Sequence, residues 1–508
     1  MPQPTVPSLP EASTGEKYVL LSAFEWLQGH RKLVMLVLVA ILAMQISPNF
    51  ELNPDGVSYM SIARNLALHG RLERLGSAHA HFAPGYAVLI SPAFFFAARP
   101  FVLIQVINLL LCVLFMLGTY AWLARYDREM ALLATAFVLV NAGFMDLFRR
   151  ASAEMAFMPA MMGAALALAV AAQTRQRQTL WKAMAAAVML VMLACFIRQV
   201  GVILAAGFAA AMVAGAIRGQ VGWLRAIVCT SAMAAAAGLV CAALVVHDNQ
   251  AAKAGSELET GYTYLNETTR SLNSRDAGLM EGLRRETAEV GRLVLPGLWK
   301  AHARSGQWLN INTILYLLVC IPVAVGWWRF ARKTFDPLVL TFPFYFVFLV
   351  CFPFDSGARY MVPMLPVVSA GVWLALQSLR GRGGKEVFFV LVVVHLLVSI
   401  GFWQNSAMAA RRDARRWPAT ERVATMIPRD QGALAERGLD YDQSLFLEYV
   451  VDRRIFRLEK EETIHPKVEW LLAPQSSSDE PGFHLERAME GVKLERRSSV
   501  SPEATTRP

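Results

Sequence analysis

The sequence predicts an α-helical protein that crosses a membrane many times. Of its 508 residues, 55% are apolar and only 17% are charged, which leaves too little polar surface for a soluble domain of this size. The apolar residues are gathered into runs of about 20, long enough to cross a hydrocarbon layer as helices, and short charged stretches separate these runs. Lipid is therefore the expected solvent for most of the chain.

The formal net charge of +10 does not indicate a nucleic-acid partner. Its Lys and Arg residues lie mostly in short loops between apolar runs, and this distribution sets the orientation of a membrane protein. A nucleic-acid-binding domain would instead gather them on one face. No nucleic acid is expected as a partner.

The N-terminal part is expected to hold a tail, an anchor and an outer loop. Residues 1–29 are rich in Pro, Ser and Glu and predict a flexible cytoplasmic tail, which ends in the basic flank His30-Arg31-Lys32. The first apolar run, 33–46, has no small-residue cleavage site and is interpreted as an uncleaved anchor. The polar stretch 49–100 follows as a first outer loop, in which weakly amphipathic pieces such as 57–68 are expected to form interfacial helices.

About eleven spans are predicted, counting the first. The others are expected near 101–123, 130–148, 155–173, 181–197, 200–217, 224–246, 308–328, 337–353, 360–379 and 386–404. With a cytoplasmic N-terminus, alternation makes every short inward loop basic, as the positive-inside rule requires. The same alternation places a long loop, 247–305, on the outer side.

The spans define a transmembrane domain over residues 30–405 and leave a tail, 406–508, outside the membrane. The tail is charged and contains strand-like runs at 444–451 and 468–472. These runs predict a small extracytoplasmic α/β domain. Its polar end, from Gln475 onward, is expected to be partly disordered.

An acidic residue follows the first span in the stretch Asn53-Pro54-Asp55-Gly56-Val57-Ser58-Tyr59. Asp55 stands at the mouth of the bilayer and Tyr59 lies four residues on. The turn Phe82-Ala83-Pro84-Gly85-Tyr86 comes after the predicted interfacial helix. Asp is also a favoured helix N-cap residue, so capping is the alternative role for Asp55.

A second acid, Glu154, lies at the next outer loop in Ser152-Ala153-Glu154, just before the following span. A second acid near Asp55 can raise the pKa of that carboxyl group. The alternative is a carboxylate that only interacts with the dipole of the following span.

Four arginines are predicted on the outer side, where short loops usually avoid Lys and Arg. They are Arg149, Arg150, Arg198 and Arg359. A single arginine at the end of a span can reach water or pair with an acid. As a group they indicate an anion at that surface, and a guanidinium is well suited to a phosphate diester.

The order of these motifs on one membrane face resembles that of the GT-C glycosyltransferases, which include protein O-mannosyltransferases and aminoarabinose transferases. The resemblance covers about residues 30–405 and includes Arg359-Tyr360. One departure is that family members often carry two prolines before the Gly-Tyr, whereas here Ala83 precedes Pro84.

The resemblance implies a transferase of the bacterial cytoplasmic membrane that acts at the periplasmic face. It would move a hexose or pentose from a polyprenyl-phosphate donor to an acceptor hydroxyl, with inversion; lipid, glycan and protein remain open as acceptors. Asp55 is then expected as the general base, with Glu154 as the second catalytic acid. The expected substrate-binding residues are Tyr59, His81, Tyr86, Arg149, Arg150, Arg198, Arg359 and Tyr360.

His79 and His81 form a His-x-His pair just before the Pro-Gly-Tyr turn. Two histidines do not fill a tetrahedral metal site, so no metal ligands and no cofactor are assigned, although a divalent metal stays open. A contact between His81 and the donor phosphate is the preferred interpretation.

Two other classes of function compete with sugar transfer. A lipid or solute transporter usually places ionisable residues near the middle of its spans, whereas the candidates here gather at one face. A surface-polysaccharide polymerase or ligase would use a lipid-linked glycan at the same face, and the sequence does not separate it from a monosaccharide transferase.

Overall fold

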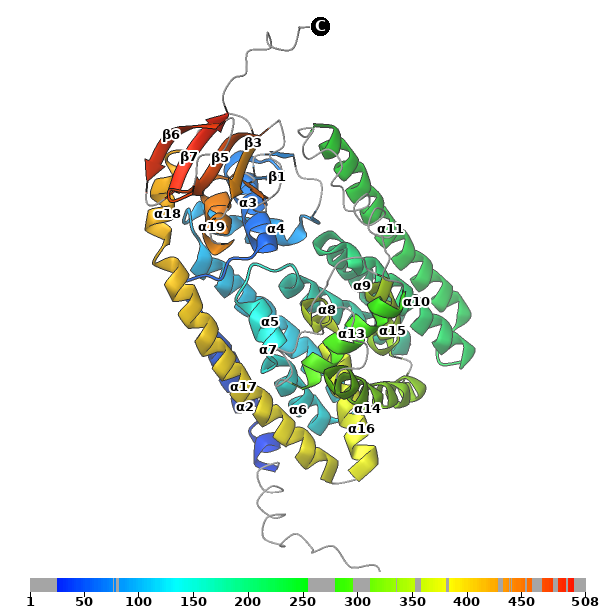
Figure 1. The fold of residues 1–508 in the computed structure, drawn as a ribbon. Coiled ribbons are helices and arrows are strands. Elements are labelled where there is room, and N and C mark those ends of the chain that lie inside the picture. The colour runs from blue at the N-terminus through cyan, green and yellow to red at the C-terminus, as the bar shows by residue number, and fades with distance from the viewer. Residues whose placement is uncertain are drawn as a thin grey trace, which may run out of the picture.

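The computed structural model describes residues 25–75, 77–78, 82–254, 279–295, 311–334, 336–351, 358–380, 383–427, 433–437, 439, 441–452, 455–458, 468–477, 483–489 and 492–497. These residues form a long helical bundle with a small sheet at one end (Figure 1). We refer to that end of the bundle as the sheet end.

The predicted polytopic helical fold is confirmed, and each predicted span coincides with a described helix or pair of helices. They are α2 (Arg31–Ala43), α5 (Phe101–Ala124), α6 (Arg128–Leu139) with α7 (Ala142–Phe148), α8 (Glu154–Gln173), α9 (Arg177–Ile197), η2 (Gln199–Gly201) with α10 (Val202–Ile217), α11 (Trp223–Ala254), α14 (Ile311–Thr334), α15 (Pro337–Cys351), η5 (Val362–Met364) with α16 (Leu365–Arg380), and α17 (Gly383–Ala414). Among the described residues, 8 helices are long and apolar enough to cross a membrane, and the α6–α7 pair, bent by 58°, makes up to 9. The two remaining predicted spans are shorter, because α2 has 13 residues and α15 has 15.

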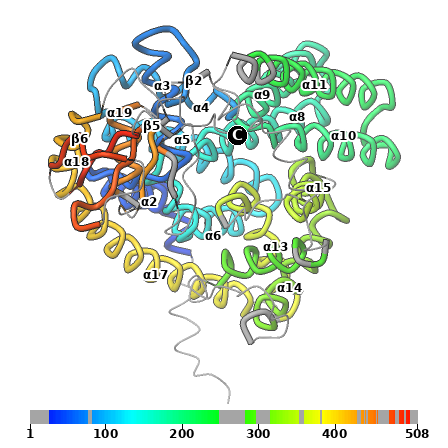
Figure 2. Tube along the Cα trace, turned by 45° about the horizontal axis from the view of Figure 1, so that its top comes forward, coloured from blue at the N-terminus to red at the C-terminus, as the bar shows by residue number. Residues whose placement is uncertain are grey.

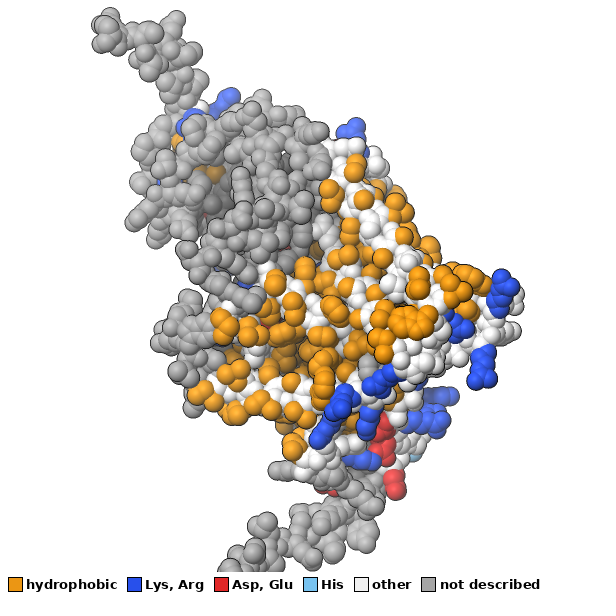
Figure 3. All heavy atoms as spheres, turned by 90° about the vertical axis from the view of Figure 1, so that its right-hand side faces the viewer, with side chains coloured by type: hydrophobic (Ala, Val, Ile, Leu, Met, Phe, Trp, Pro, Cys, Tyr) orange, Lys and Arg blue, Asp and Glu red, His pale blue; other side chains and the backbone are white. Residues whose placement is uncertain are grey.

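The outer surface of the bundle is apolar where lipid is expected. Figure 3 shows hydrophobic side chains over the middle of one face, with Lys and Arg side chains gathered at its lower edge. Leu239 of α11, Leu318 of α14 and Val347 of α15 are all more than half exposed on the described chain. Such large apolar patches are rare on soluble proteins and fit a lipid-facing surface.

The bend between α6 and α7 has a local cause at Asn141. This residue has an extended backbone, and its side-chain oxygen accepts a hydrogen bond from the Gly143 amide at 3.0 Å, which caps α7. Its amide group donates to the Leu293 carbonyl oxygen at 2.7 Å. The chain therefore restarts a helix in a new direction, and α7 carries Arg149 and Arg150 immediately after its last turn.

The segment predicted to be the first outer loop folds into short elements at the sheet end: α3 (Pro54–His69), β1 (Glu73–Arg74) paired with β2 (Ser77–Ala78), α4 (Gly85–Ile90) and η1 (Ser91–Phe95). Figures 1 and 2 both place α3 and α4 between the C-terminal sheet and the α9–α11 side of the bundle. The predicted helix at 57–68 is thus present as α3. It is more enclosed than an interfacial helix, since Val57, Met60 and Ile62 are fully buried.

The C-terminal part forms a small α/β domain, as predicted. Its elements are α18 (Trp417–Ala424), β3 (Ala433–Arg437), α19 (Tyr441–Val451), β4 (Ile455–Leu458), β5 (Val468–Pro474), β6 (Phe483–Met489) and β7 (Val492–Arg497). The strand order is β4-β3-β5-β7-β6, with β3 parallel to β4 and β5, and β7 antiparallel to β5 and β6. Leu434, Leu447 and Leu472 form the centre of its core.

Two details of this domain correct the sequence prediction. Residues 444–451 lie in helix α19 and are not a strand. This helix is buried on two sides, with Phe446 in the core of the bundle and Leu447 in the core of the domain, so its apolar run lacks the one-sided helical pattern. The stretch from Gln475 onward, expected to be partly disordered, contains strands β6 and β7; residues 498–508 lie outside the described residues.

The predicted long outer loop contains a helix, α13 (Leu279–Val294), which packs against α14 and α15. Gly282 permits this packing because a Cβ there would lie 2.1 Å from the Val350 carbonyl oxygen. Residues 255–278 and 296–310 of the loop lie outside the described residues.

Candidate active site

Asp55 lies in the first turn of α3, at the sheet end of the bundle. The helix begins at Pro54, a residue whose fixed φ suits a first helical position, and Asn53 is the N-cap residue. The alternative that Asp55 is the cap is therefore wrong. The Asp55 carboxylate forms an ion pair with Arg359 of η4 (Ala358–Tyr360), with 2.7 Å between Oδ2 and Nη1.

Gly56 lets the start of α3 approach the segment before α8 closely. A Cβ at this position would lie 2.3 Å from Asn53 Oδ1 and 3.2 Å from the Ala151 carbonyl oxygen. Because a larger residue would push the two segments apart, the glycine keeps Asp55 near the start of α8, where Glu154 lies.

A second ion pair joins Glu154, the first residue of α8, to Arg198 between α9 and η2. Glu154 Oε1 and Arg198 Nη1 are 2.5 Å apart, and the two side chains are only 6% and 12% exposed. The Ser152 hydroxyl also donates a hydrogen bond to the Glu154 carboxylate. Glu154 does lie at a helix start, and it also has a specific cationic partner.

The ring of Tyr360 connects the two ion pairs. The Arg198 guanidinium carbon lies 4.4 Å from the ring centroid and that of Arg359 lies 4.8 Å from it. Tyr345 of α15 donates a hydrogen bond to the Tyr360 carbonyl oxygen at 2.8 Å. Asp55, Glu154, Arg198, Arg359 and Tyr360 therefore form one group, which we call the central cluster.

The charges within the central cluster balance, since two carboxylates face two guanidinium groups. Burial alone would lower the pKa of Arg359, but the carboxylates of Asp55 and Glu154 raise it above its ordinary value. Tyr59, one turn after Asp55 on α3, is buried, and burial raises its pKa well above the usual range. Tyr59 thus keeps its proton and stays a hydrogen-bond donor beside the cluster.

Arg149 and Arg150 lie in a second group of charges, which we call the second cluster. The Glu51 carboxylate lies 3.2 Å from Arg149 Nη2 and accepts a hydrogen bond from Arg150 Nε at 3.0 Å. Asp146 pairs with Arg150 at 3.1 Å. Arg359 is close enough for its charge to act on Asp146 and Arg150, so the two clusters are neighbours.

Sequence reasoning missed the two acids of the second cluster. Glu51 lies between the first span and Asp55, in the same polar segment. Asp146 lies four residues before Arg150, a spacing that places both side chains on one face of a helix. The position of Glu51 and the spacing of Asp146 are both visible in the sequence. Neither identifies which of the four arginines forms an ion pair with each acid.

Tyr86 is fully buried below Tyr59, and the two rings meet edge to face at 5.4 Å. Its hydroxyl donates a hydrogen bond to Asn108 Oδ1 at 3.0 Å, and Asn108 in turn donates to the Arg150 carbonyl oxygen at 2.9 Å. Burial raises the pKa of Tyr86, so its hydroxyl is neutral. Tyr86 thus supports Tyr59 and the backbone of the second cluster from inside the bundle.

The turn needs a glycine at position 85, because the backbone of another segment lies too close for a side chain. A Cβ at Gly85 would lie 2.7 Å from the Phe196 carbonyl oxygen and 2.9 Å from Ile197 Cα. The turn therefore packs directly on the backbone that leads into Arg198. The Pro84-Gly85-Tyr86 motif positions one arginine of the central cluster through this contact.

His79 and His81 lie outside the described residues, so the structure does not place the predicted contact of His81. Within the described ranges, no group of three or more His, Cys, Asp or Glu side chains is arranged to hold a metal ion.

The helices, the folded segment between α2 and α5 and the C-terminal sheet together define the fold of a polytopic membrane protein, and solved membrane proteins share this fold. Over 93% of its length the chain is similar to ArnT from Cupriavidus metallidurans bound to undecaprenyl phosphate, with a TM-score of 0.59, 11% sequence identity and 98% of that chain covered. The apo state of the same ArnT matches 92% of this chain and 97% of its own, with a TM-score of 0.53 and 11% identity.

The oligosaccharyltransferase of Archaeoglobus fulgidus, in its apo form, is a more distant neighbour. It is 13% identical, with a TM-score of 0.49, and the match covers 87% of this chain and 69% of that one. A scan with protein-family models finds no match, and a search of curated protein sequences finds none either. The likeness to ArnT is one of fold.

Proposed function

We propose that this protein is a membrane glycosyltransferase that uses a polyprenyl-phosphate-linked sugar as donor and an acceptor hydroxyl as nucleophile. The observation that carries the proposal is the central cluster, in which a carboxylate and two guanidinium groups meet on one aromatic ring. Its setting supports the proposal, because a solved protein of the same fold holds undecaprenyl phosphate. The reaction would take place at the periplasmic face of a bacterial cytoplasmic membrane.

Asp55 is the proposed general base. In an inverting transfer, the acceptor oxygen forms a bond to the anomeric carbon from one side while the bond from that carbon to the phosphate oxygen breaks on the other. The hydroxyl proton passes to the Asp55 carboxylate, and the electrons of the broken bond stay with the phosphate. Asp55 is 30% exposed, so an acceptor can reach it.

Arg359 and Arg198 are the proposed phosphate-binding residues. The phosphate changes from a diester to a monoester as the sugar leaves and so gains negative charge. Guanidinium groups that already point at this position stabilise the transition state more than the substrate. Arg198 is held by Glu154, and Arg359 by Asp55; Glu154 is thus a positioning residue in addition to its expected role as the second acid.

The Asp55–Arg359 ion pair links binding of the donor to the availability of the Asp55 carboxylate as a base. Arg359 occupies one oxygen of the Asp55 carboxylate, so an acceptor hydroxyl that approaches this oxygen must displace the guanidinium. We infer that Arg359 exchanges the carboxylate for the donor phosphate and so releases Asp55 for the acceptor proton. Tyr59, as a neutral donor next to both groups, can hydrogen-bond a sugar or phosphate oxygen.

The direct test is Asp55→Asn in the full chain, purified in mild detergent and supplied with a radiolabelled polyprenyl-phosphate sugar and extracted membrane lipids as acceptors. We expect the variant to fold and to lose transfer by at least about a hundredfold, the lower range of a general-base contribution. Glu73→Gln is the matched control, because Glu73 is an acid of the same loop whose side chain pairs only loosely with Arg71, at 3.5 Å. Undiminished turnover by Asp55→Asn would remove Asp55 from the mechanism.

A further inference from the structure

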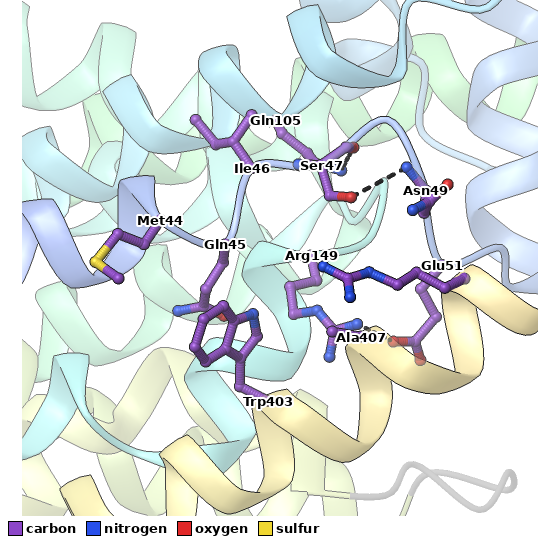
Figure 4. A pocket seen from close by; sticks show the side chains of 11 residues that line it. Met44, Gln45, Ile46, Ser47, Asn49, Glu51, Gln105, Arg149, Trp403 and Ala407 are labelled. Atoms are coloured by element: carbon purple, nitrogen blue, oxygen red, sulfur yellow. Dashed lines mark hydrogen bonds and ion pairs between the residues drawn. The ribbon is translucent and has the colours of Figure 1, made fainter.

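A pocket beside the second cluster has no role in the proposed transfer. It has a volume of about 120 Å³ and lies where the end of α2, the segment that follows it, α5 and α17 meet. Figure 4 shows Gln45, Arg149 and Trp403 converging on this pocket, with Glu51 and Gln105 at its sides. Arg411, one helical turn after Ala407, completes the wall on α17.

Three buried polar atoms of this pocket have no hydrogen-bond partner within the described part of the chain: Arg149 Nη1, Gln45 Oε1 and Glu51 Oε2. The Glu51 oxygen forms an ion pair with Arg149 Nη2 at 3.2 Å, which leaves Arg149 Nη1 and Gln45 Oε1 without any partner among the described residues. The Arg149 side chain is only 7% exposed and Gln45 only 4%. A buried donor and a buried acceptor that face one pocket favour a ligand that supplies the opposite groups, because leaving both unpaired costs free energy.

The charge around the pocket favours a singly charged anion. The carboxylates of Glu51 and Asp146 are balanced by the guanidinium groups of Arg149 and Arg150. Arg411 adds one positive charge to the wall. A phosphodiester carries one negative charge and accepts several hydrogen bonds, so it matches both the excess charge and the unpaired Arg149 nitrogen.

The surroundings of the pocket favour a lipid as the carrier of that phosphodiester. Met44, at the pocket wall, is 69% exposed, and on α17 the apolar side chains of Leu397 and Met408 are 64% and 60% exposed. Trp403 lies where α17 changes from apolar residues to charged ones, the level at which tryptophan marks the membrane interface. Acyl chains attached to a headgroup in the pocket can therefore lie along α2 and α17.

We propose that this pocket binds the headgroup of an anionic glycerophospholipid of the surrounding bilayer. The phosphodiester accepts hydrogen bonds from Arg149 and Arg411, and a headgroup hydroxyl donates to Gln45 Oε1. No residue that lines the pocket belongs to the central cluster, so loss of lipid binding and loss of sugar transfer can be measured separately.

The test is native mass spectrometry of the delipidated full chain after addition of phosphatidylglycerol, phosphatidylcholine or inorganic phosphate. We expect phosphatidylglycerol to be retained in preference to phosphatidylcholine, which lacks headgroup hydroxyls and net charge. Arg411→Ala should weaken retention by roughly tenfold, the effect of losing one charge-assisted hydrogen bond. Arg412→Ala is the matched control, since Arg412 is the next residue on α17, is also exposed, and does not line the pocket.

Gln45→Leu tests independently the proposed hydrogen bond between a headgroup hydroxyl and Gln45 Oε1. It should remove most of the preference for phosphatidylglycerol over phosphatidylcholine while leaving the protein folded, because leucine preserves the volume of the side chain. Equal retention of the two lipids by the wild-type protein would overturn the proposal. The same conclusion follows if Arg411→Ala and Arg412→Ala behave alike, or if only inorganic phosphate binds.

Discussion

Arg359 contacts two groups of the proposed active site, the carboxylate of Asp55 and the ring of Tyr360. It lies on the short helix η4, just before the Tyr360 carbonyl oxygen that accepts a hydrogen bond from Tyr345. Its position is therefore determined by backbone and ring contacts as well as by charge. This arrangement predicts that substitution of Arg359 changes the KM for the donor and the KM for the acceptor to different extents.

Arg359→Ala should raise the KM for the lipid-linked donor by about tenfold or more, because one charge-assisted contact to phosphate is lost. The KM for the acceptor should change much less. Steady-state rates measured while each substrate is varied in turn will separate the two effects. Arg71→Ala, at a 72% exposed side chain of the same face, is the control; an equal rise in both KM values would assign Arg359 a structural role.

Gly85→Ala should destabilise the protein by about 1–3 kcal/mol, the usual cost of an extra methyl group in a closed space. The added Cβ would meet backbone atoms of Phe196 and Ile197, which cannot rotate away. Thermal unfolding in detergent measures the loss. Gly238→Ala, on α11 with open space around the Cβ position, should cause none; equal melting temperatures for the two variants would contradict the close contact.

At the scale of elements, α3 is held from the side opposite to the bundle by the C-terminal domain. Asp452, at the end of α19, accepts hydrogen bonds from Ser61 at 2.6 Å and Asn65 at 2.8 Å, and pairs with Arg64 at 2.7 Å. All three partners lie on α3, which also carries Asp55. Asp452 has a φ of 52°, a conformation that Asp and Asn tolerate better than most residues.

Asp452→Asn keeps this backbone conformation and removes the charge. We expect a loss of about 2 kcal/mol in stability, in the range for hydrogen bonds to a charged group. Limited proteolysis should detect earlier cleavage at the junction between α19 and β4. Asp413→Asn, at a surface pair whose Arg412 is 68% exposed, should cost less than about 1 kcal/mol; a matching small effect at Asp452 would mean that the domain is held elsewhere.

At the scale of the whole molecule, the proposal depends on which side of the membrane the sheet end faces. The basic loops at 124–128 and 174–177 predict that the opposite end is cytoplasmic. Ser477, in an exposed turn after β5, should then lie outside, and Gln178, exposed at the start of α9, should lie inside.

Ser477→Cys and Gln178→Cys, each in a background without the native cysteines, test this orientation. A membrane-impermeant thiol reagent added to intact spheroplasts should label the cysteine at 477 and spare the one at 178, and lysis should expose both. The reverse labelling pattern would place the central cluster in the cytosol and rule out a periplasmic transferase.

The sequence alone was sufficient for the membrane class, the positions of the spans and the existence of a C-terminal α/β domain. Hydrophobic length and the distribution of Lys and Arg are local properties of the chain, so they can be read without knowing which helices touch. The same holds for Asp55, Glu154, Arg198 and Arg359 as candidates, because each is an ionisable residue at the predicted outer end of a span.

Only the tertiary structure decided which charges meet. Asp55 pairs with Arg359, which lies far from it in the sequence. Arg149 and Arg150 instead pair with Glu51 and Asp146. Ion pairs depend on distances of a few ångströms between helices distant in sequence, and the packing at residues such as Gly56 and Gly85 sets those distances. The helical state of 444–451 also depends on tertiary structure. A helix that is buried on two sides lacks the single apolar face by which sequence periodicity identifies a helix.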